Sequence, residues 1–431
     1  MRFASLDEWL QWQESLHLRE IDLGLERVER VLHCLGLGRS LGVPVITIGG
    51  TNGKGSCGVM LEGILSAAGY RVGLYSSPHL IKYNERIRIN GQIVTDAALC
   101  EAFERIDQAR LVCNGDDERL SLTYFEFGTL AALDLFVKNK LDVILLEVGM
   151  GGRLDAVNVV DADVALVTTV DLDHQQWLGN DRETIGFEKA GIFRANRPAV
   201  CADLNPPQSL LEYARSINTR LYCAGIDYQW RIERDHWCWI GPEHQYDDLP
   251  PPALMGDIQF QNAAAAIMVL ETLQDFRVKS DDIRRGMKDA KLAGRFQRAN
   301  CSRPVYLDVA HNPQSARALA KILESAPVDG RTHGVIGMLQ DKDVGEVVKT
   351  MAPNIDYWYG SGVQGSRGMD AQKMGLALKN NLPGVKLCVS ESVPIALSVA
   401  LSKMQKGDRM VVFGSFYTVA DALRYFKDNP Q

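Results

Sequence analysis

The sequence predicts an α/β protein with two domains, each organised around a mostly parallel β-sheet. Three observations support this fold class. A glycine-rich turn joins a β-branched run to a helical segment at 45–68, apolar runs at 141–148 and 164–170 end in polar residues, and strands alternate with helices after residue 296. With 431 residues, the chain is longer than one hydrophobic core usually serves. We therefore expect two domains with a boundary near residue 296.

Composition and charge exclude several classes of protein. Of the residues, 46% are hydrophobic and 23% are charged, no apolar run approaches a membrane span, and Asp7 and Glu8 lie where a signal peptide needs an apolar core. The net charge of −7 argues against a broad nucleic-acid-binding surface, which needs clustered lysine and arginine. We expect a cytoplasmic protein with neither a membrane nor a nucleic acid as partner.

The nine cysteines are scattered and form no C-x-x-C pair. This pattern indicates reduced, mostly buried thiols, agrees with a cytoplasmic location and argues against a zinc site.

The N-terminal residues 5–35 carry apolar side chains at helical spacing, interrupted at Ile21-Asp22-Leu23-Gly24. We predict two helices with a bend at Gly24. From the residues alone, the bend is simple punctuation between the helices.

The glycine-rich turn, Gly49-Gly50-Thr51-Asn52-Gly53-Lys54-Gly55-Ser56, follows a predicted strand at 45–48 and precedes a helical segment at 60–68. Backbone N–H groups in such a turn and the positive end of the next helix bind phosphate, and Lys54 adds a point charge. The match to G-x-x-x-x-G-K-[ST] is imperfect, because Gly55 separates Lys54 from Ser56. This argues against Ser56 as a Mg²⁺ ligand. An ordinary glycine turn is the alternative, and the flanking strand and helix favour the phosphate loop.

Three other predicted strands end in side chains that bind metals. The strand at 71–75 leads to Ser77, the strand at 141–148 contains Glu147, and the strand at 164–170 is followed by Asp173-His174. The carboxyl ends of parallel strands meet at one edge of a sheet, where such folds bind ligands, so these side chains are candidate Mg²⁺ ligands. The alternatives are a Ser-Pro turn, an ion pair of Glu147 with Arg153 and a structural histidine.

The rest of the N-terminal domain is predicted in less detail. Residues 86–91 fit a strand and hairpin turn, 121–137 a capped apolar helix, and 183–191 a helix that contains Lys189. Glu126 lies in the predicted helix at 121–137. It is either solvated or forms part of a pocket wall with its flanking aromatic residues. Short β-like pieces occur at 200–255, where no function is legible. An alanine-rich helix is expected at 261–273, and Asn262 would serve as its cap.

After Gly294-Arg295-Phe296-Gln297 the pattern alternates regularly between strand and helix. The expected strands are 305–309, 334–338, 355–359, 385–389 and 410–413, and the expected helices are 314–324, 343–352, 370–380, 392–404 and 417–427. The first strand ends in Asp308-Val309-Ala310-His311-Asn312-Pro313, again with polar groups at a carboxyl edge. We thus expect an N-terminal phosphate-loop ATPase-like domain at 1–296 and a C-terminal Rossmann-like α/β domain at 297–431.

Several of these segments resemble the folylpolyglutamate synthase/dihydrofolate synthase branch of the ATP-dependent Mur ligases, including its Lys-Gly-Ser loop. The matching segments occur in family order across most of the chain: Gly50 to Ser56, Tyr75 to Leu80, Leu146 to Asp155, Asp173-His174, Phe187 to Ile192, Gly294 to Phe296 and Asp308 to Pro313. The resemblance implies a Mur-ligase-type ATP-binding domain followed by a Rossmann-like glutamate-ligase domain.

The resemblance also implies the reaction. ATP phosphorylates a substrate carboxylate, the amino group of L-glutamate attacks the acyl phosphate, and the intermediate loses phosphate to leave an amide. The implied cofactors are ATP, two Mg²⁺ ions and a monovalent cation. Family members that also act on dihydropteroate resemble this chain in three segments, Ile21-Asp22-Leu23-Gly24, Thr123-Tyr124-Phe125-Glu126 and Leu154-Asp155-Ala156. We therefore expect a monomer that adds glutamate to dihydropteroate and to reduced folates, with the aromatic residues beside the pterin or benzoate ring.

The resemblance further implies site residues. The ATP-binding residues would be Thr51, Asn52, Gly53, Lys54, Asn262, Arg295 and Asp308. Ser77 and Glu147 would hold one Mg²⁺ and His174 a second, which Lys189 would help to hold once it is carbamylated. His311 matches an active-site residue at the glutamate or phosphate end, and Lys54, Lys189 and His311 are the implied catalytic residues.

Three alternative functions compete with the bifunctional ligase. One is a folylpolyglutamate synthase without the dihydrofolate synthase activity. A Mur ligase of cell-wall synthesis would need a separate uridine-nucleotide domain before the phosphate loop, and only some 40 residues precede it. A phosphate-loop regulatory protein without ligase activity would hydrolyse ATP indifferently to glutamate and dihydropteroate.

Overall fold

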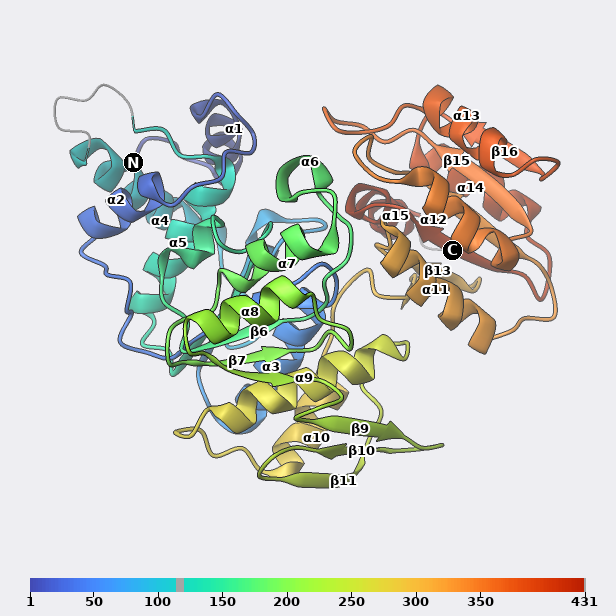
Figure 1. The fold of residues 1–431 in the computed structure, drawn as a ribbon. Helices are drawn as coiled ribbons and strands as arrows, with labels where there is room; N and C mark the ends of the chain where they lie inside the picture. Colours follow the sequence, from blue (N-terminus) through green and yellow to red (C-terminus); the bar gives the residue numbers. More distant parts are fainter. Residues whose placement is uncertain (114–119, 430–431) are drawn as a thin grey trace. The chain divides into compact units, whose positions relative to one another are not determined.

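The computed structural model describes residues 1–113 and 120–429. The chain forms two compact units (Figure 1). Unit 1 comprises Met1–Ala253 with Phe260–Ala290, and unit 2 comprises Leu254–Gln259 with Lys291–Gln431. The α/β class predicted from the sequence is confirmed in both units.

Unit 1 is built on an eight-stranded sheet, which is parallel except at the β3 and β4 edge. In spatial order its strands are β4 (Gln92–Ile93), β3 (Ile87–Ile89), β2 (Val72–Tyr75), β5 (Val143–Glu147), β1 (Val45–Gly49), β6 (Val164–Val167), β7 (Pro198–Cys201) and β8 (Arg220–Cys223). The strands predicted at 45–48, 71–75, 86–91, 141–148 and 164–170 are therefore confirmed.

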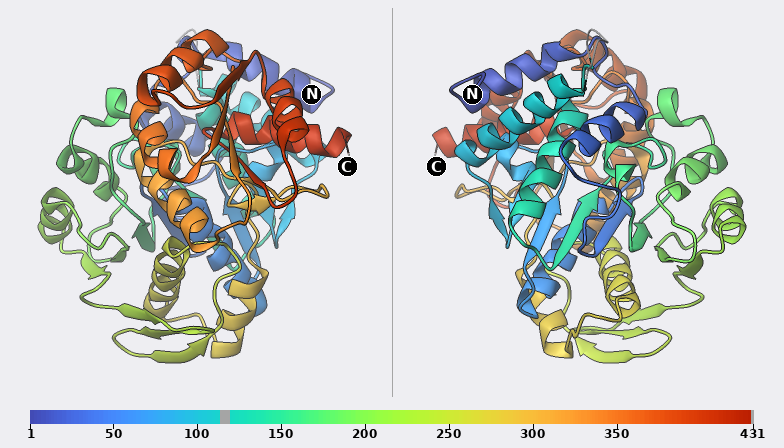
Figure 2. Two further views of the ribbon diagram at one scale, coloured as in Figure 1. Left: turned by 90° about the vertical axis from the view of Figure 1, so that its right-hand side faces the viewer. Right: turned by 90° about the vertical axis from the view of Figure 1, so that its left-hand side faces the viewer.

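Helices cover both faces of this sheet. They are α1 (Leu6–Leu16), α2 (Glu26–Cys34), α3 (Lys54–Ala67), α4 (Asp96–Val112), α5 (Tyr124–Lys138), α6 (Gln175–Leu178), α7 (Arg182–Ala190), α8 (Gln208–Ser216), α9 (Ile258–Thr272) and α10 (Ser280–Asp289), with short 3₁₀ turns η1 (Tyr83–Arg86) and η2 (Ala156–Val159). Figure 2 shows α4 and α5 on one side of the strands.

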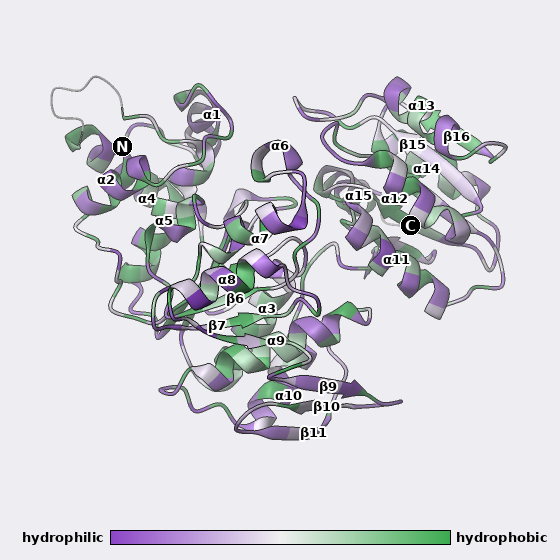
Figure 3. Cartoon of the chain, in the orientation of Figure 1, coloured by the Kyte–Doolittle hydropathy of each residue, from purple (hydrophilic) through white to green (hydrophobic). Residues whose placement is uncertain are grey.

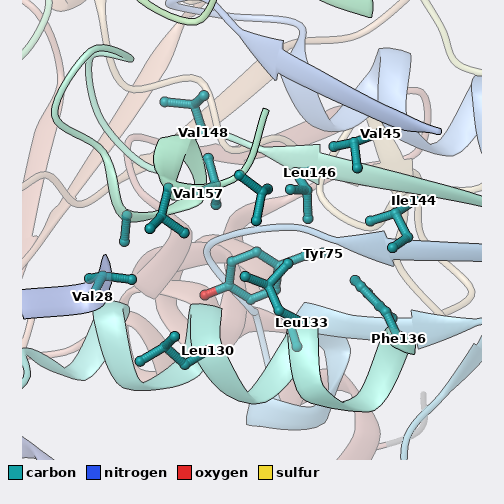
Figure 4. Packing of buried hydrophobic residues seen from close by; sticks show 14 of the residues in the cluster. Val28, Val45, Tyr75, Leu130, Leu133, Phe136, Ile144, Leu146, Val148 and Val157 are labelled. Atoms are coloured by element: carbon teal, nitrogen blue, oxygen red, sulfur yellow. The ribbon is translucent and has the colours of Figure 1, made fainter. Parts of the chain in front are cut away.

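The main core lies between the sheet and α5. Leu130, Leu133 and Phe136 of this helix point toward Tyr75 and Ile144 on the strands (Figure 4). All five are buried. Removal of this much apolar surface from water is the principal stabilising term of the layer. A capping box fixes the start of α5, because the Thr123 hydroxyl accepts from the Glu126 N–H and the Glu126 carboxylate accepts from the Thr123 N–H.

A separate antiparallel sheet follows β8, within the stretch that sequence reasoning left illegible. It consists of β9 (Gln229–Ile232), β10 (Trp237–Ile240) and β11 (Gln245–Leu249). The indole N–H of Trp239 donates to the Ala264 carbonyl of α9 at 3.0 Å, which anchors this sheet on that helix. Figure 3 shows β9 and β11 coloured mainly as hydrophilic, as expected for strands that face solvent on one side.

Unit 2 has a six-stranded sheet, parallel except for its first strand. In spatial order the strands are β12 (Gln297–Arg298), β13 (Val305–Leu307), β17 (Arg409–Phe413), β14 (Thr332–Ile336), β15 (Tyr357–Ser361) and β16 (Leu387–Ser390). The helices are α11 (Pro313–Ser325), α12 (Val344–Met351), α13 (Ala371–Asn381), α14 (Val393–Lys403) and α15 (Phe416–Asp428), with the 3₁₀ turn η3 (Ala352–Asn354). Each strand and helix predicted after residue 296 is confirmed, with small shifts of its ends.

A buried polar network closes the amino-terminal end of this second sheet. His333 is buried and lies 3.0 Å from the Tyr359 hydroxyl and 3.1 Å from a carboxylate oxygen of Asp408. Asp408 also accepts from the backbone N–H groups of Arg331 and Gln405, both at 2.7 Å. Burial opposes ionisation of Asp408, but these hydrogen bonds and the one with His333 outweigh it, so its pKa lies below the ordinary value.

Two local predictions were wrong. Asn262 does not cap its helix, because α9 already begins at Ile258 and Asn262 lies inside the first turns. Cys34 and Cys113 form a disulfide with their Cα atoms 6.2 Å apart, whereas free thiols were expected throughout. The other cysteines of the described segments are free, as predicted. Over residues 1–113 and 120–429, no helix is long and apolar enough to cross a membrane.

Candidate active site

The sheet register of unit 1 aligns four strand ends at one carboxyl edge. Ile48 lies opposite Glu147, Gly49 opposite Val167, and Tyr75 opposite Leu146. The segments that follow β1, β2, β5 and β6 therefore start side by side. This is the edge at which open parallel sheets bind ligands.

The glycine-rich turn is braced against the end of β6. The Thr51 N–H donates to the Thr169 carbonyl at 2.7 Å, and the Thr51 hydroxyl donates to the Asp171 carbonyl at 3.0 Å. The Thr168 hydroxyl donates to the Asn52 carbonyl at 2.6 Å. These contacts hold the turn in one shape before α3 begins at Lys54.

Two glycines in the turn are required by its geometry. Gly53 has φ +96°, and a Cβ there would lie 2.5 Å from the Asn262 side-chain oxygen. Gly50 has φ +134°, and a Cβ there would lie 1.9 Å from the Thr168 hydroxyl. Asn262 is thereby placed beside the turn, although α9 lies more than 200 residues along the chain. The Lys54 ammonium folds onto the turn and donates to the carbonyls of Gly50 and Thr51.

Ser77 and Glu147 lie next to each other. The Ser77 N–H donates to a carboxylate oxygen of Glu147 at 3.2 Å, which connects the ends of β2 and β5. Glu147 is buried, so its carboxylate gains from a cation or from donors. Arg153, which was the alternative partner for Glu147, forms its ion pair with Glu188, at 2.8 Å.

Lys189 is buried at the end of α7, near groups from other elements of the same edge. Burial and, to a smaller extent, the charge of Lys54 lower the pKa of Lys189 to about 7, although Asp173 and Asp155 act in the opposite direction. Burial also raises the pKa of Asp155 to about 7, against hydrogen bonds from the N–H groups of Met150 and Val157. The structure therefore gathers two lysines and two aspartates at this edge.

His174 follows β6 and begins the short helix α6. It has φ +51°, and its N–H donates to the Asp173 carboxylate at 2.8 Å. The His174 ring is 25% exposed. Its position after β6 puts it at the same sheet edge as Ser77 and Glu147.

The three segments 21–24, 123–126 and 154–156 come from distant parts of the sequence and meet in unit 1. The Gly24 N–H donates to the Leu154 carbonyl at 3.2 Å. Arg27 bridges Asp22 and Glu126, with distances of 2.8 and 3.0 Å. Phe125 packs over the loop that precedes Leu154, so closely that a Cβ on Gly149 would lie 2.7 Å from its ring.

In unit 2, the three predicted site residues, Arg295, Asp308 and His311, lie near one another. Phe296 N–H and Ala310 N–H each donate to the Asp308 carboxylate at 2.8 Å. Burial raises the pKa of Asp308, while the charges of Arg295 and His311 oppose this shift. The Arg295 guanidinium lies 5.7 Å from the ring of Phe416, and the His311 ring lies 6.0 Å from it.

Sequence reasoning missed two kinds of residue at these sites. Asp173 was noted only as a neighbour of His174, yet its charge affects the buried Lys189. Arg27 was not noted at all, although it contacts two predicted segments. An arginine on the first turn of α2, five residues after Asp22, was the available signal.

The comparisons with known proteins agree across the whole chain. Residues 294–416 match the family described as Mur ligase, glutamate ligase domain. The chain is 42% identical over 420 residues to dihydrofolate synthase/folylpolyglutamate synthase of Escherichia coli strain K12, covering 97% of this chain and 95% of that one. It is 38% identical over 437 residues to the protein of the same name from Haemophilus influenzae, covering 97% of each.

Solved structures give the same result. A structure described as E. coli FolC in complex with DHPP and ADP has a TM-score of 0.92 and 40% identity, and the match covers 99% of each chain. A bifunctional folylpolyglutamate synthase/dihydrofolate synthase with Mn, AMPPNP and L-glutamate bound has a TM-score of 0.89 and 40% identity, with 98% of each chain covered. The fold, the sheet-edge site and the full-length identity show that this chain belongs to the dihydrofolate synthase/folylpolyglutamate synthase family of Mur ligases.

Proposed function

We propose that this chain is an ATP-dependent carboxylate–amine ligase that joins L-glutamate to dihydropteroate, forming dihydrofolate, and to reduced folates, forming folylpolyglutamates. The observation that carries the proposal is the full-length identity to bifunctional relatives, 42% for the E. coli protein. Support also comes from structures of relatives that are described as holding DHPP, ADP, AMPPNP, Mn or L-glutamate.

The chemistry explains why ATP is needed. Hydroxide is a poor leaving group, so an amine does not displace it from a carboxylate at a useful rate. Transfer of the terminal phosphoryl group of ATP to the substrate carboxylate gives an acyl phosphate and ADP. The amino group of glutamate then attacks the carbonyl carbon, and phosphate leaves as the amide forms. The protein contributes positioning and charge neutralisation.

The nucleotide would be bound by the turn before α3. We assign Thr51, Asn52, Gly53 and Lys54 to it. Gly53 and Lys54 lie at the positive end of α3, and Lys54 adds one ammonium group. The N–H groups of Thr51 and Asn52 donate to Thr169 and hold the turn in shape. The closeness of Asn262 to Gly53 supports a role for its amide in the same site. From unit 2, we assign Arg295 and Asp308 to the nucleotide.

The metal sites follow from the chemistry of the donors. Ser77 and Glu147 are adjacent, and a hydroxyl with a buried carboxylate suits Mg²⁺, which prefers oxygen ligands. We assign a second Mg²⁺ to His174 and carbamylated Lys189, with a monovalent cation as a further cofactor. The metal would neutralise phosphate charge when bound.

Lys189 is suited to carbamylation because only a neutral amine attacks CO₂. Its pKa of about 7 leaves a large neutral fraction at physiological pH, whereas an ordinary lysine is almost fully protonated there. The product is an anionic carbamate, which can ligate a cation. The two lysines of the site would then differ in charge, with Lys54 positive and Lys189 negative.

The pteroyl substrate would lie at the meeting point of three segments. These are Ile21, Asp22, Leu23 and Gly24; Thr123, Tyr124, Phe125 and Glu126; and Leu154, Asp155 and Ala156. Their contacts support one site, and the ring of Phe125 offers an aromatic face. In unit 2, His311 is assigned to the glutamate or phosphate end.

The remaining features of the proposal concern the whole protein. We assign residues 1–296 to the Mur-ligase-type ATP-binding domain and 297–431 to the glutamate-ligase domain. We expect a monomer in the cytoplasm whose partners are small molecules. The Cys34–Cys113 disulfide is unusual for that compartment, where thiols are normally kept reduced.

One assay tests the function. Radiolabelled glutamate is supplied with ATP and Mg²⁺, with either dihydropteroate or tetrahydrofolate as acceptor, and ADP release is followed in parallel. We expect ADP and amide in equal amounts with both acceptors. Incorporation into tetrahydrofolate alone would favour the folylpolyglutamate synthase alternative. ATP hydrolysis that is indifferent to glutamate and both acceptors would refute the ligase.

A further inference from the structure

Arg27, on the first turn of α2, joins two segments of the proposed pteroyl site. Its Nη1 donates to the Asp22 carboxylate at 2.8 Å, and its Nη2 donates to the Asp22 carbonyl at 2.7 Å. Nη2 and Nε also donate to one oxygen of Glu126, at 3.0 and 3.2 Å. One guanidinium therefore fixes both the main chain and the side chain of Asp22 relative to α5.

The carboxylate of Glu126 is used within the protein. One oxygen accepts from the Nη2 of Arg27 at 3.0 Å, and the other accepts from the Thr123 N–H at 2.7 Å and from the Nε of Arg27 at 3.4 Å. The Glu126 side chain is only 4% exposed, and burying a carboxylate is costly unless it has partners of this kind. Glu126 was predicted as a substrate-binding residue. Within the proposed pteroyl site its contacts give it a supporting role, because it holds Arg27 and the start of α5.

Further hydrogen bonds connect Asp22 and the rest of the loop 21–24 to other segments. His17 places one ring nitrogen 3.1 Å from the Asp22 carboxylate and the other 2.7 Å from the Ser121 hydroxyl. The Gly24 N–H donates to Leu154. The loop 21–24 is thus connected to both other segments of the proposed site, and Arg27 makes five of the hydrogen bonds.

We propose that Arg27 is a positioning residue for the pteroyl substrate: it holds the loop 21–24 against the N-terminus of α5, so that the groups of both segments that face the ring system are set before the substrate binds. This inference rests on the proposed function. Asp22 retains partial exposure, 25% for its side chain, and can meet the N–H groups of a pterin. Preorganisation of this kind lowers the cost of ordering loops on binding.

The role requires arginine specifically. The planar fork donates in several fixed directions at once, which matches a carboxylate, a carbonyl and a second carboxylate. Lysine retains the charge but cannot reproduce this geometry. The charge-preserving variant therefore separates the positioning role from simple neutralisation of Glu126.

The test compares Arg27→Met and Arg27→Lys with a matched control, Arg105→Met. Arg105 also pairs with a buried acid on α5, Asp134, at 2.5 Å, but contacts none of the three segments. All variants are assayed in the full chain, with dihydropteroate, ATP and glutamate varied in turn. We expect both Arg27 variants to raise the KM for dihydropteroate by about tenfold or more, while the KM for ATP changes less than about twofold. Arg105→Met should leave both KM values near those of the wild type.

Thermal unfolding and chemical rescue complete the test. If Arg27→Met does not fold, Arg27→Lys decides the result. Methylguanidinium added to Arg27→Ala should lower the KM for dihydropteroate and leave Arg105→Met unaffected. Arg27 variants that lose stability like the control, with an unchanged KM for dihydropteroate, would overturn the positioning role. Failure of the wild type to use dihydropteroate would instead overturn the proposed function, so the two failures are distinguishable.

Discussion

Lys189 should react with CO₂ at a pH where an ordinary lysine does not. Its pKa is about 7 instead of 10.5, because the amine is buried and Lys54 lies nearby. At a pH below both values, this difference corresponds to roughly 3,000-fold more neutral amine. Since the pKa is depressed, the amine is neutral above pH 7 and protonated below it. Carbamate should therefore increase as the pH rises through 7 and disappear as the pH falls.

The assay is ¹³C NMR of the protein in ¹³C-bicarbonate between pH 6 and 8.5. We expect a carbamate resonance whose intensity has its midpoint near pH 7. Lys189→Arg should lack this resonance and lose glutamate incorporation. Lys138→Arg, which replaces a lysine at the exposed end of α5, should retain both.

Two results would refute this reasoning. The first is a carbamate resonance that persists in Lys189→Arg. The second is a wild-type protein without any carbamate resonance over this pH range, which would mean that the buried amine is protonated or blocked by its neighbours.

Four other substitutions probe the same structure. Lys54→Ala should abolish glutamate incorporation but cost less than about 1 kcal/mol of stability, because the amine donates to backbone carbonyls of the turn that the turn's own hydrogen bonds already hold in place; wild-type turnover would contradict the phosphate-loop assignment. Glu147→Gln should raise the Mg²⁺ concentration needed for half-maximal turnover, and an unchanged Mg²⁺ titration would exclude Glu147 as a ligand. Gly53→Ala should destabilise by about 1–2 kcal/mol in urea unfolding, because of its positive φ and the clash with Asn262; equal stability would show that the turn can rearrange. Asp408→Asn should lower the melting temperature above pH 4, and the melting temperatures of the variant and the wild type should converge in acid. The reason is that a carboxylate with a depressed pKa contributes stability that is lost as the pH falls through that pKa. A difference in melting temperature that stays constant down to pH 2 would contradict this contribution of Asp408.

The features that the sequence predicted correctly are local ones. The β1–α3 turn is readable because its β-branched strand, glycines and lysine are contiguous, and the strands and helices after residue 296 are readable because each has its own periodicity. Where contiguous residues determine an element, its predicted ends lie within a few residues of the observed ends.

The features that were missed depend on contacts between distant segments. Nothing near Lys189 in the sequence distinguishes it, because its pKa is set by burial and by Lys54. The Arg27 contacts join residues 99 positions apart, and the disulfide joins residues 79 apart. Asn262 was misplaced as a cap because the polar residues before it, including Gln259, continue the helix instead of ending it.

The strand order of unit 2 determines when that unit can fold during synthesis. The last strand, β17, lies between β13 and β14 and is hydrogen-bonded to both. The centre of the sheet is therefore completed only after Arg409–Phe413 has been synthesised, and any nascent chain that ends before Arg409 presents two unpaired strand edges. Unit 1, whose central strands β1, β5 and β6 end by Val167, can form its sheet centre long before that point.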